Sequence, residues 1–140
     1  MARLSLTLRN DVSEIVRLVE SLERFGQEAG LHDEVAFRVT LALDEIVSNV
    51  IRHGFEDGGE HPITVTVDVT GGTITATVVD DGRPFDPLQA PPPDLDVPLA
   101  VRKPGGLGIH LVKTTMDDVV YTRDGTRNVL TMRTSVASRE

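Results

Sequence analysis

The sequence predicts an α/β (α+β) two-layer sandwich, in which a mixed, largely antiparallel sheet is covered on one face by three helices. Apolar residues recur with a period of two in two adjacent runs between Ile63 and Val79, as expected of half-buried strands. They recur at helical spacing in two earlier stretches, Val12–Leu22 and Ala36–Val50. Elements that are apolar on one side bury those sides together, so we expect a single domain over residues 1–140.

The composition excludes several kinds of partner and site. A formal net charge of −8 repels nucleic acid phosphates and anionic lipid, so neither is expected as a partner. The absence of cysteine excludes disulfides and thiolate metal sites, and the four histidines do not cluster at metal-ligand spacing. Neither a signal peptide nor a long apolar run is present, so we expect a cytoplasmic protein without a membrane contact.

The N-terminal third predicts one strand and two helices. Alternation over Leu4–Leu8 indicates a strand, and Asn10 or Asp11 can cap the helix that follows and ends at Gly30. Asp33 or His32 opens the central helix, which ends at Gly54.

The central helix has two opposed faces. Its core face comprises Ala36, Val39, Leu43, Ile46, Val47 and Val50, and a stripe on the opposite side comprises Arg38, Glu45, Asn49 and Arg52. Glu45 and Asn49 lie one turn apart, a pairing in which the amide oxygen can ligate a hard cation and the carboxylate can take a proton. Asp44 points about 100° away and is the weaker candidate. Such a pair also occurs on solvated helix faces, and two later stretches favour a functional role.

The first of these follows a hairpin. Ile63–Val69 and Thr73–Val79 alternate on either side of Gly71-Gly72, and the parity of the second strand directs Asp80 into the buried layer. A carboxylate there needs a donor from the protein or from a ligand, such as the amino group of adenine. Gly82 allows the chain to turn close to a ligand. An ordinary Asp-Gly turn is the alternative interpretation.

The second stretch follows a proline-rich connection over residues 86–104, which has the length of a lid or a disordered segment. It leads to Arg102 and Lys103 and then to Gly105-Gly106-Leu107-Gly108-Ile109, which opens a helix. Backbone N–H groups at such a helix start, together with the basic pair, can bind phosphate. Val119–Arg123 and Val129–Thr134 then predict two strands that complete the sheet.

The order of these motifs resembles that of the GHKL ATPase superfamily. The N, G1 and G2 boxes of that superfamily are similar to Glu45-x-x-x-Asn49, Asp80-x-Gly82 and Gly105-Gly106-x-Gly108. Within it, residues 42–49 with His53-Gly54 and residues 80–87 look most like the anti-sigma factor serine/threonine kinases of bacterial partner-switching systems. The resemblance covers nearly the whole chain and implies the Bergerat-type ATP-binding fold.

The resemblance also implies a function. It implies a protein that binds ATP and Mg²⁺, phosphorylates an anti-anti-sigma (STAS-type) partner on serine or threonine, and sequesters a sigma factor or similar regulator. Glu45 would be the catalytic base, Asn49 the Mg²⁺ ligand and Asp80 the adenine reader, beside Gly82 and Phe85. Residues 86–104 would form the ATP lid. The phosphates would be bound by Arg102, Lys103, Gly105, Gly106, Leu107, Gly108 and Ile109.

Two departures from the superfamily pattern stand out. Pro84 replaces a second glycine of the G1 box and removes a backbone donor beside the base pocket, and the proline-rich lid matches by position alone. The alternative function is a non-catalytic, nucleotide-gated binding module of the same fold. The sequence leaves open whether the chain forms a homodimer.

Overall fold

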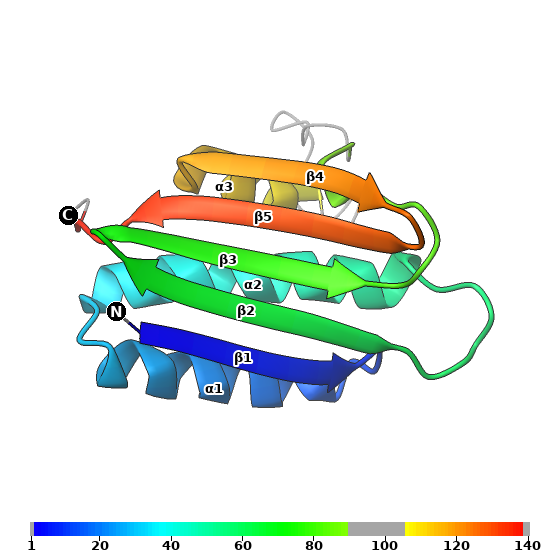
Figure 1. The fold of residues 1–140 in the computed structure, drawn as a ribbon, viewed down its shortest axis with the longest axis horizontal. Helices are drawn as coiled ribbons and strands as arrows, with labels where there is room; N and C mark the ends of the chain where they lie inside the picture. The colour runs from blue at the N-terminus through cyan, green and yellow to red at the C-terminus, as the bar shows by residue number, and fades with distance from the viewer. Residues whose placement is uncertain (1, 90–105, 139–140) are drawn as a thin grey trace.

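The computed structural model describes residues 2–89 and 106–138. Within these residues the chain forms five strands, three α-helices and one 3₁₀ turn (Figure 1). In chain order they are β1 (Ala2–Arg9), α1 (Glu14–Glu28), α2 (Asp33–His53), β2 (Pro62–Thr70), β3 (Thr73–Asp80), η1 (Pro87–Gln89), α3 (Gly106–Thr115), β4 (Asp118–Asp124) and β5 (Arg127–Ser135).

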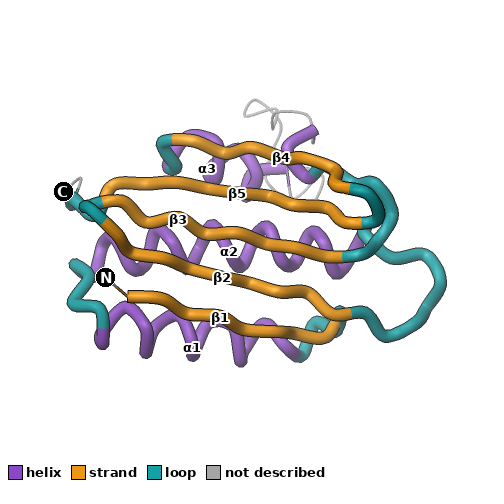
Figure 2. Tube along the Cα trace, viewed as in Figure 1, coloured by secondary structure: helices purple, strands orange, loops and turns teal. Residues whose placement is uncertain are grey.

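The elements form two layers, with the three helices on one face of the sheet (Figure 2). The strand order is β1-β2-β3-β5-β4. The predicted two-layer sandwich is confirmed, and each of the four strand pairings is antiparallel. Of the helices in the described part of the chain, none is long and apolar enough to cross a bilayer.

Local chemistry explains where the predicted elements begin and end. His32 is the N-cap of α2, where its Nδ1 accepts from the Glu34 N–H at 3.1 Å, and Gly54 is the C-cap. Gly71 and Gly72 have φ of 59° and 81°, which a two-residue hairpin turn between β2 and β3 requires. Asn10 does not cap α1, because its side chain bonds to Gly59 O and His61 N in the connection before β2.

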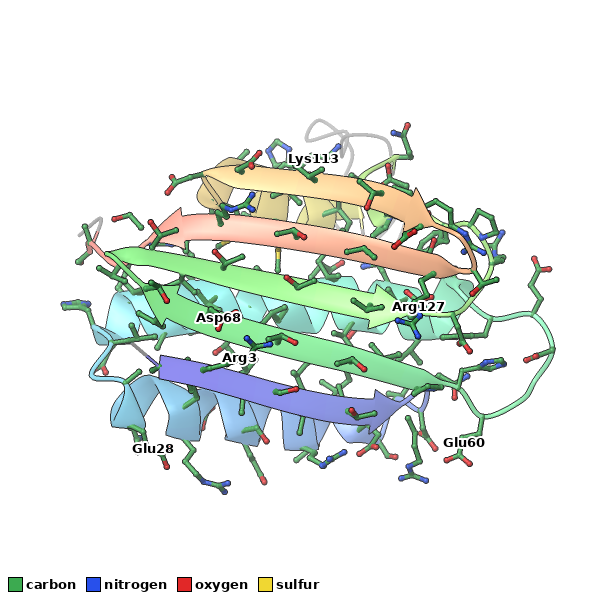
Figure 3. The ribbon with its side chains drawn as sticks, viewed as in Figure 1. Arg3, Glu28, Glu60, Asp68, Lys113 and Arg127 are labelled. Atoms are coloured by element: carbon green, nitrogen blue, oxygen red, sulfur yellow. The ribbon has the colours of Figure 1, made fainter. Side chains whose placement is uncertain are left out.

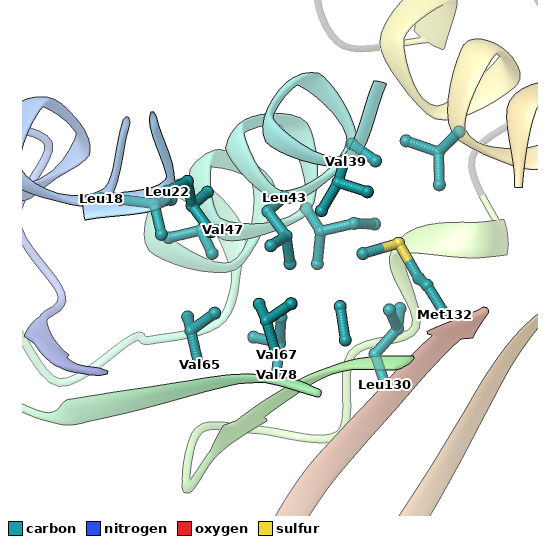
Figure 4. Packing of buried hydrophobic residues seen from close by; sticks show 14 of the residues in the cluster. Leu18, Leu22, Val39, Leu43, Val47, Val65, Val67, Val78, Leu130 and Met132 are labelled. Carbon is teal, nitrogen blue, oxygen red and sulfur yellow. The ribbon is translucent and has the colours of Figure 1, made fainter. Parts of the chain in front are cut away.

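The core lies between the sheet and the helices (Figure 4). Leu18 and Leu22 of α1 and Leu43 and Val47 of α2 face the apolar residues of the inner strands. The strand residues that complete this layer include Val65, Val67, Val78, Leu130 and Met132. Burial of each such side chain stabilises the fold by about 1.5–3 kcal/mol.

The outer face of the sheet is open and polar. Arg3 and Asp68 are cross-strand partners there and form an ion pair at 3.6 Å (Figure 3). The same period of two therefore separates the buried layer from the outer face, and it places Asp80, the last residue of β3, on the buried side at 4% exposure.

Candidate functional site

The first part of the site is the pair of polar residues on α2. The Asn49 amide nitrogen donates to the Glu45 carbonyl at 2.7 Å and to Glu45 Oε1 at 2.8 Å. Asn49 is only 6% exposed, whereas Glu45 is half-buried. Because the nitrogen is engaged with Glu45, the amide oxygen is directed to the other side, where it can ligate a cation.

Gly108 of α3 lies directly against the carboxyl group of Glu45. A Cβ placed on Gly108 would overlap the Glu45 carboxyl group, so any larger residue would displace the carboxylate or the helix. α3 begins at Gly106 and packs beside α2 (Figure 1). The glycine-rich start of one helix and the acid of another therefore meet, although 63 positions separate them in the sequence, the difference between 108 and 45.

Asp80 forms the second part of the site, at the end of β3. Its Oδ1 accepts from the Gly82 N–H at 2.9 Å and from Asn128 Nδ2 at 3.0 Å. A buried carboxylate requires hydrogen-bond donors, and here the protein provides them, both to Oδ1. Oδ2 is the oxygen that remains for a ligand N–H.

Asn128 of β5 holds the segment after β3 in place, and the sequence did not single it out. It is 4% exposed and is the register partner of Asp80. Besides Asp80, its amide nitrogen donates to the Arg83 carbonyl at 2.8 Å. Its oxygen accepts from the Tyr121 hydroxyl, from Arg123 Nη1 at 3.2 Å and from the Phe85 N–H at 3.4 Å.

The same segment is fastened to the end of α2. A Cβ on Gly82 would collide with the Gly54 carbonyl oxygen, and that oxygen accepts from the Arg83 N–H at 2.9 Å. Glycine at position 82 is therefore required by close contact with the α2 terminus. The Phe85 ring lies 5.8 Å from the His53 ring, between ring centroids. His53 lies two turns beyond Glu45 on α2, so one helix connects both parts of the site.

A second set of contacts flanks the site on the solvent side. His61 Nε2 lies 2.8 Å from Asp57 Oδ2, and His61 Nδ1 lies 3.1 Å from Asp81 Oδ1. The hydrogen bond with Asp57 raises the pKa of His61 above its usual value. The hydrogen bond from the Gly59 N–H lowers the pKa of Asp57, and the hydrogen bond with His61 lowers it further by a smaller amount. We call His61, Asp57 and Asp81 the histidine clasp, because they tie the connection before β2 to the segment after β3.

The remaining expected site residues divide into three groups. Arg102, Lys103 and Gly105 lie outside the described residues, as does most of the expected lid at 86–104. Gly106 and Leu107 form the first turn of α3. Ile109 is 1% exposed and belongs to the core, which leaves only its backbone available to a phosphate.

The structure corrects the predicted stripe on α2 at one position. Arg38 is only 6% exposed, so its guanidinium does not form an accessible polar surface together with Glu45. Its guanidinium pairs with Glu34 at 2.7 Å and donates to Thr134 Oγ1 and the Ser135 carbonyl, both at 3.0 Å. Arg38 thus joins α2 to the end of β5, because the sheet and α3 enclose more of α2 than one apolar face.

The donors fit a magnesium nucleotide. In the described part of the chain, no group of three or more His, Asp and Glu residues could hold a metal ion by itself. Magnesium usually takes one or two protein oxygens and completes its shell with phosphate and water, which the Asn49 amide oxygen and a phosphate near Gly108 would allow. The fit therefore depends on the Gly108 contact and on the direction of the Asn49 amide.

Comparison with known proteins identifies the class. A model of the histidine kinase-like ATPase domain matches residues 8–134, and the chain belongs to this family. Its solved neighbours support the fold. The RsbU and RsbW domains of a Mycobacterium tuberculosis protein superpose with a TM-score of 0.69 at 16% identity, over 96% of this chain and 32% of that one. The chain thus spans about a third of that structure. A blue-light activated histidine kinase domain from Erythrobacter litoralis gives 0.55 at 21% identity, over 85% of this chain and 61% of that one.

The relatives narrow the assignment. The serine/threonine-protein kinase BtrW of Bordetella bronchiseptica is 33% identical over 69% of this chain and 68% of its own length. The serine-protein kinase RsbW of Listeria monocytogenes is 29% identical over 79% of this chain and 74% of its own. Within the family, the chain belongs to the branch of protein serine/threonine kinases that BtrW and RsbW represent.

Proposed function

We propose that this protein is an ATP-dependent serine/threonine kinase that phosphorylates an anti-anti-sigma (STAS-type) protein and, when that protein is phosphorylated, sequesters a sigma factor or similar regulator. The observation that carries the proposal is the contact between Glu45, hydrogen-bonded to Asn49, and Gly108 at the start of α3. It brings a carboxylate, a side-chain amide and a glycine at a helix start to one place, which supports these roles. A partner of this kind places the protein in the cytoplasm.

Each residue has a distinct role in this proposal. Mg-ATP supplies the phosphoryl group, and the chain binds and orients it. The Asn49 amide oxygen ligates Mg²⁺, and Asp80 accepts from the adenine amino group through Oδ2. The backbone of residues 105–108, with Arg102 and Lys103, binds the phosphates, and residues 86–104 close over them as a lid.

Glu45 is the base in this proposal. Its carboxylate takes the proton of the incoming serine or threonine hydroxyl, for which it must come within hydrogen-bond distance of that oxygen. Asn49 donates to Oε1, which fixes the carboxyl plane and leaves Oε2 for the hydroxyl. The protein supplies positioning and charge, which are its main contributions to phosphoryl transfer.

The test compares two neighbouring acids. In Glu45→Ala, we expect ATP affinity to stay within about twofold, because Asn49 still donates to the backbone carbonyl of residue 45. Loss of a general base typically lowers the rate by roughly 10²–10⁴-fold, so phosphotransfer should fall by that factor. Labelled ATP and the anti-anti-sigma proteins of the same genome provide the assay.

Asp44→Ala is the matched control. Asp44 is also half-buried on α2, but it accepts from Ser48 Oγ at 3.0 Å on another side of the helix. This variant should transfer phosphate at a rate near that of the wild type. If the wild-type protein binds ATP and a partner tightly without transferring phosphate, the alternative binding module is the correct function.

A further inference from the structure

Three large apolar side chains remain exposed on the helical layer near Glu45. Phe37 is 68% exposed, Leu41 44% and Leu111 39%. Single exposed apolar residues are ordinary, but a group of them beside a functional site is typical of an interaction surface. We call these three residues the apolar ridge.

The helices place the members of the ridge together. Phe37 and Leu41 are one turn apart on α2, and Leu41 is one turn before Glu45. α2 and α3 pack side by side and run in opposite directions (Figure 1). The turn of α3 that leads from Gly108 forward to Leu111 therefore points in the same direction as the turn of α2 that leads from Glu45 back to Leu41. Since Ile109 and Val112 of α3 are in the core, Leu111 lies on the outer side of the seam between the helices.

A pocket adjoins the ridge on the side of Phe37. It has a volume of about 260 Å³, lies between α1 and α2, and includes Gly26, Leu31 and Phe37 in its lining. Glu23 and Asp33 also line it. The surface that runs from Leu41 along α2 toward α1 is thus apolar at the ridge and acidic at this rim.

We propose that the apolar ridge is the docking surface for the phosphoacceptor protein. This inference rests on the proposed function, since it concerns the protein whose hydroxyl Glu45 deprotonates. That hydroxyl must approach the Glu45 carboxylate to about 3 Å. Residues one helical turn apart are separated by only about 5–6 Å, so a folded protein that reaches Glu45 also covers Leu41 and Leu111.

The ridge specifies the chemistry of its partner. The acceptor protein carries an apolar patch beside its serine or threonine, since burial of exposed leucine and phenylalanine is the main source of affinity that the ridge offers. It also carries lysine or arginine at the edge of that patch, opposite Glu23 and Asp33. An acidic or uniformly polar partner does not fit.

The experiment separates docking from nucleotide binding. Each anti-anti-sigma protein of the same genome is purified and incubated with γ-labelled ATP and the wild-type chain, and the protein that becomes phosphorylated is the probe. In Leu41→Glu and Leu111→Glu, we expect the KM for this probe to rise at least about tenfold, as for loss of an apolar contact at an interface centre. The KM for ATP should stay within about twofold.

A matched control comes from the other side of the molecule. Val120 of β4 is 43% exposed and lies on the face of the sheet away from the helices, so Val120→Glu should change neither KM. Leu41→Ser and Leu111→Ser repeat the test with milder changes, and thermal melting verifies that each variant folds. If the wild type phosphorylates the probe and the ridge variants retain its KM, the docking proposal alone is wrong. If the wild type phosphorylates none of the proteins, the docking proposal and the proposed function are both wrong.

Discussion

At the scale of single residues, the two oxygens of Asp80 differ, since one is bonded to protein donors and the other is the one that the proposed adenine contact uses. Both protein donors, the Gly82 N–H and Asn128 Nδ2, bond to Oδ1. A carboxylate held in this way presents Oδ2 in a fixed direction at little further entropic cost. If Asp80 reads the base as proposed, base recognition depends on Asn128 as well.

This arrangement predicts selectivity for ATP over GTP. The oxo group of guanine offers no donor to Oδ2, and loss of a hydrogen bond to a charged group costs about 1.5–3 kcal/mol, or roughly ten- to a hundredfold in affinity. Asn128→Ala should reduce the affinity for ATP and also the ratio of ATP affinity to GTP affinity. The reason is that Asp80 loses the hydrogen bond from Asn128, which orients its carboxylate. Calorimetric titration of both nucleotides measures these values.

Thr131→Ala is a control on the same strand, three residues further along β5 and on its other face. It should leave the ratio unchanged. Equal binding of ATP and GTP by the wild type would make Asp80 a structural turn residue, which was the alternative interpretation of the sequence.

Asn128 also marks the limit of prediction from the sequence. The parity of β3 alone placed Asp80 in the buried layer, because side chains alternate strictly along a strand. Its partner comes from a strand 48 residues later, and only the pairing of β3 with β5 aligns the two. No local pattern fixes that register, so the proposed base pocket was predictable from one side only.

At the scale of elements, local chemistry made most boundaries predictable. Glycines at 71 and 72 between two alternating runs predicted the hairpin. Asp33 or His32 predicted the start of α2, and Gly54 predicted its end. The buried position of Arg38 was harder to predict, because an amphipathic pattern distinguishes only two sides of a helix. α2 is enclosed by α1, the sheet and α3, so a third side is buried and accommodates polar residues with partners.

The histidine clasp links two connections and should depend on pH. The charged form of His61 stabilises the folded protein, because the pKa of His61 is higher in the folded state than in the unfolded state. This contribution is present below the unfolded-state pKa of about 6.5 and is lost as the pH rises through the higher folded value. The pKa of Asp57 is lowered, so its contribution is present above about pH 4 and is lost as the pH falls further.

His61→Gln should therefore lower the melting temperature most between about pH 4.5 and 6.5, and less as the pH rises above this range. A reduction of about 1–2 °C is expected, because the clasp is solvent-accessible. Thermal melting of both proteins at several pH values tests this. A difference that is constant from pH 5 to 9 would show that the clasp acts through packing against Phe55, whose ring stacks on His61 at 4.8 Å, and not through charge.

At the scale of the whole molecule, α2 joins the two parts of the proposed nucleotide site. Glu45 meets α3 through Gly108, and Gly54 at the end of the same helix meets Gly82 of the segment after β3. A nucleotide bound at both places would bridge α2, α3 and the sheet. Since the unfolded chain lacks this arrangement, Mg-ATP should stabilise the fold by about 2.7 kcal/mol at a concentration one hundred times its dissociation constant.

Asn49→Ala tests whether Asn49 couples Mg²⁺ to this stabilisation. Asn49 is buried and hydrogen-bonded to Glu45, so the substitution should lower stability without nucleotide by about 1 kcal/mol. The relevant quantity is therefore the rise in melting temperature that each protein shows on addition of ATP, measured with Mg²⁺ and with a chelator. In the wild type, Mg²⁺ should increase this rise, whereas in Asn49→Ala the rise should be small and nearly the same with and without Mg²⁺. A variant that keeps the full magnesium dependence would show that Asn49 is a structural partner of Glu45 and that the cation is held elsewhere.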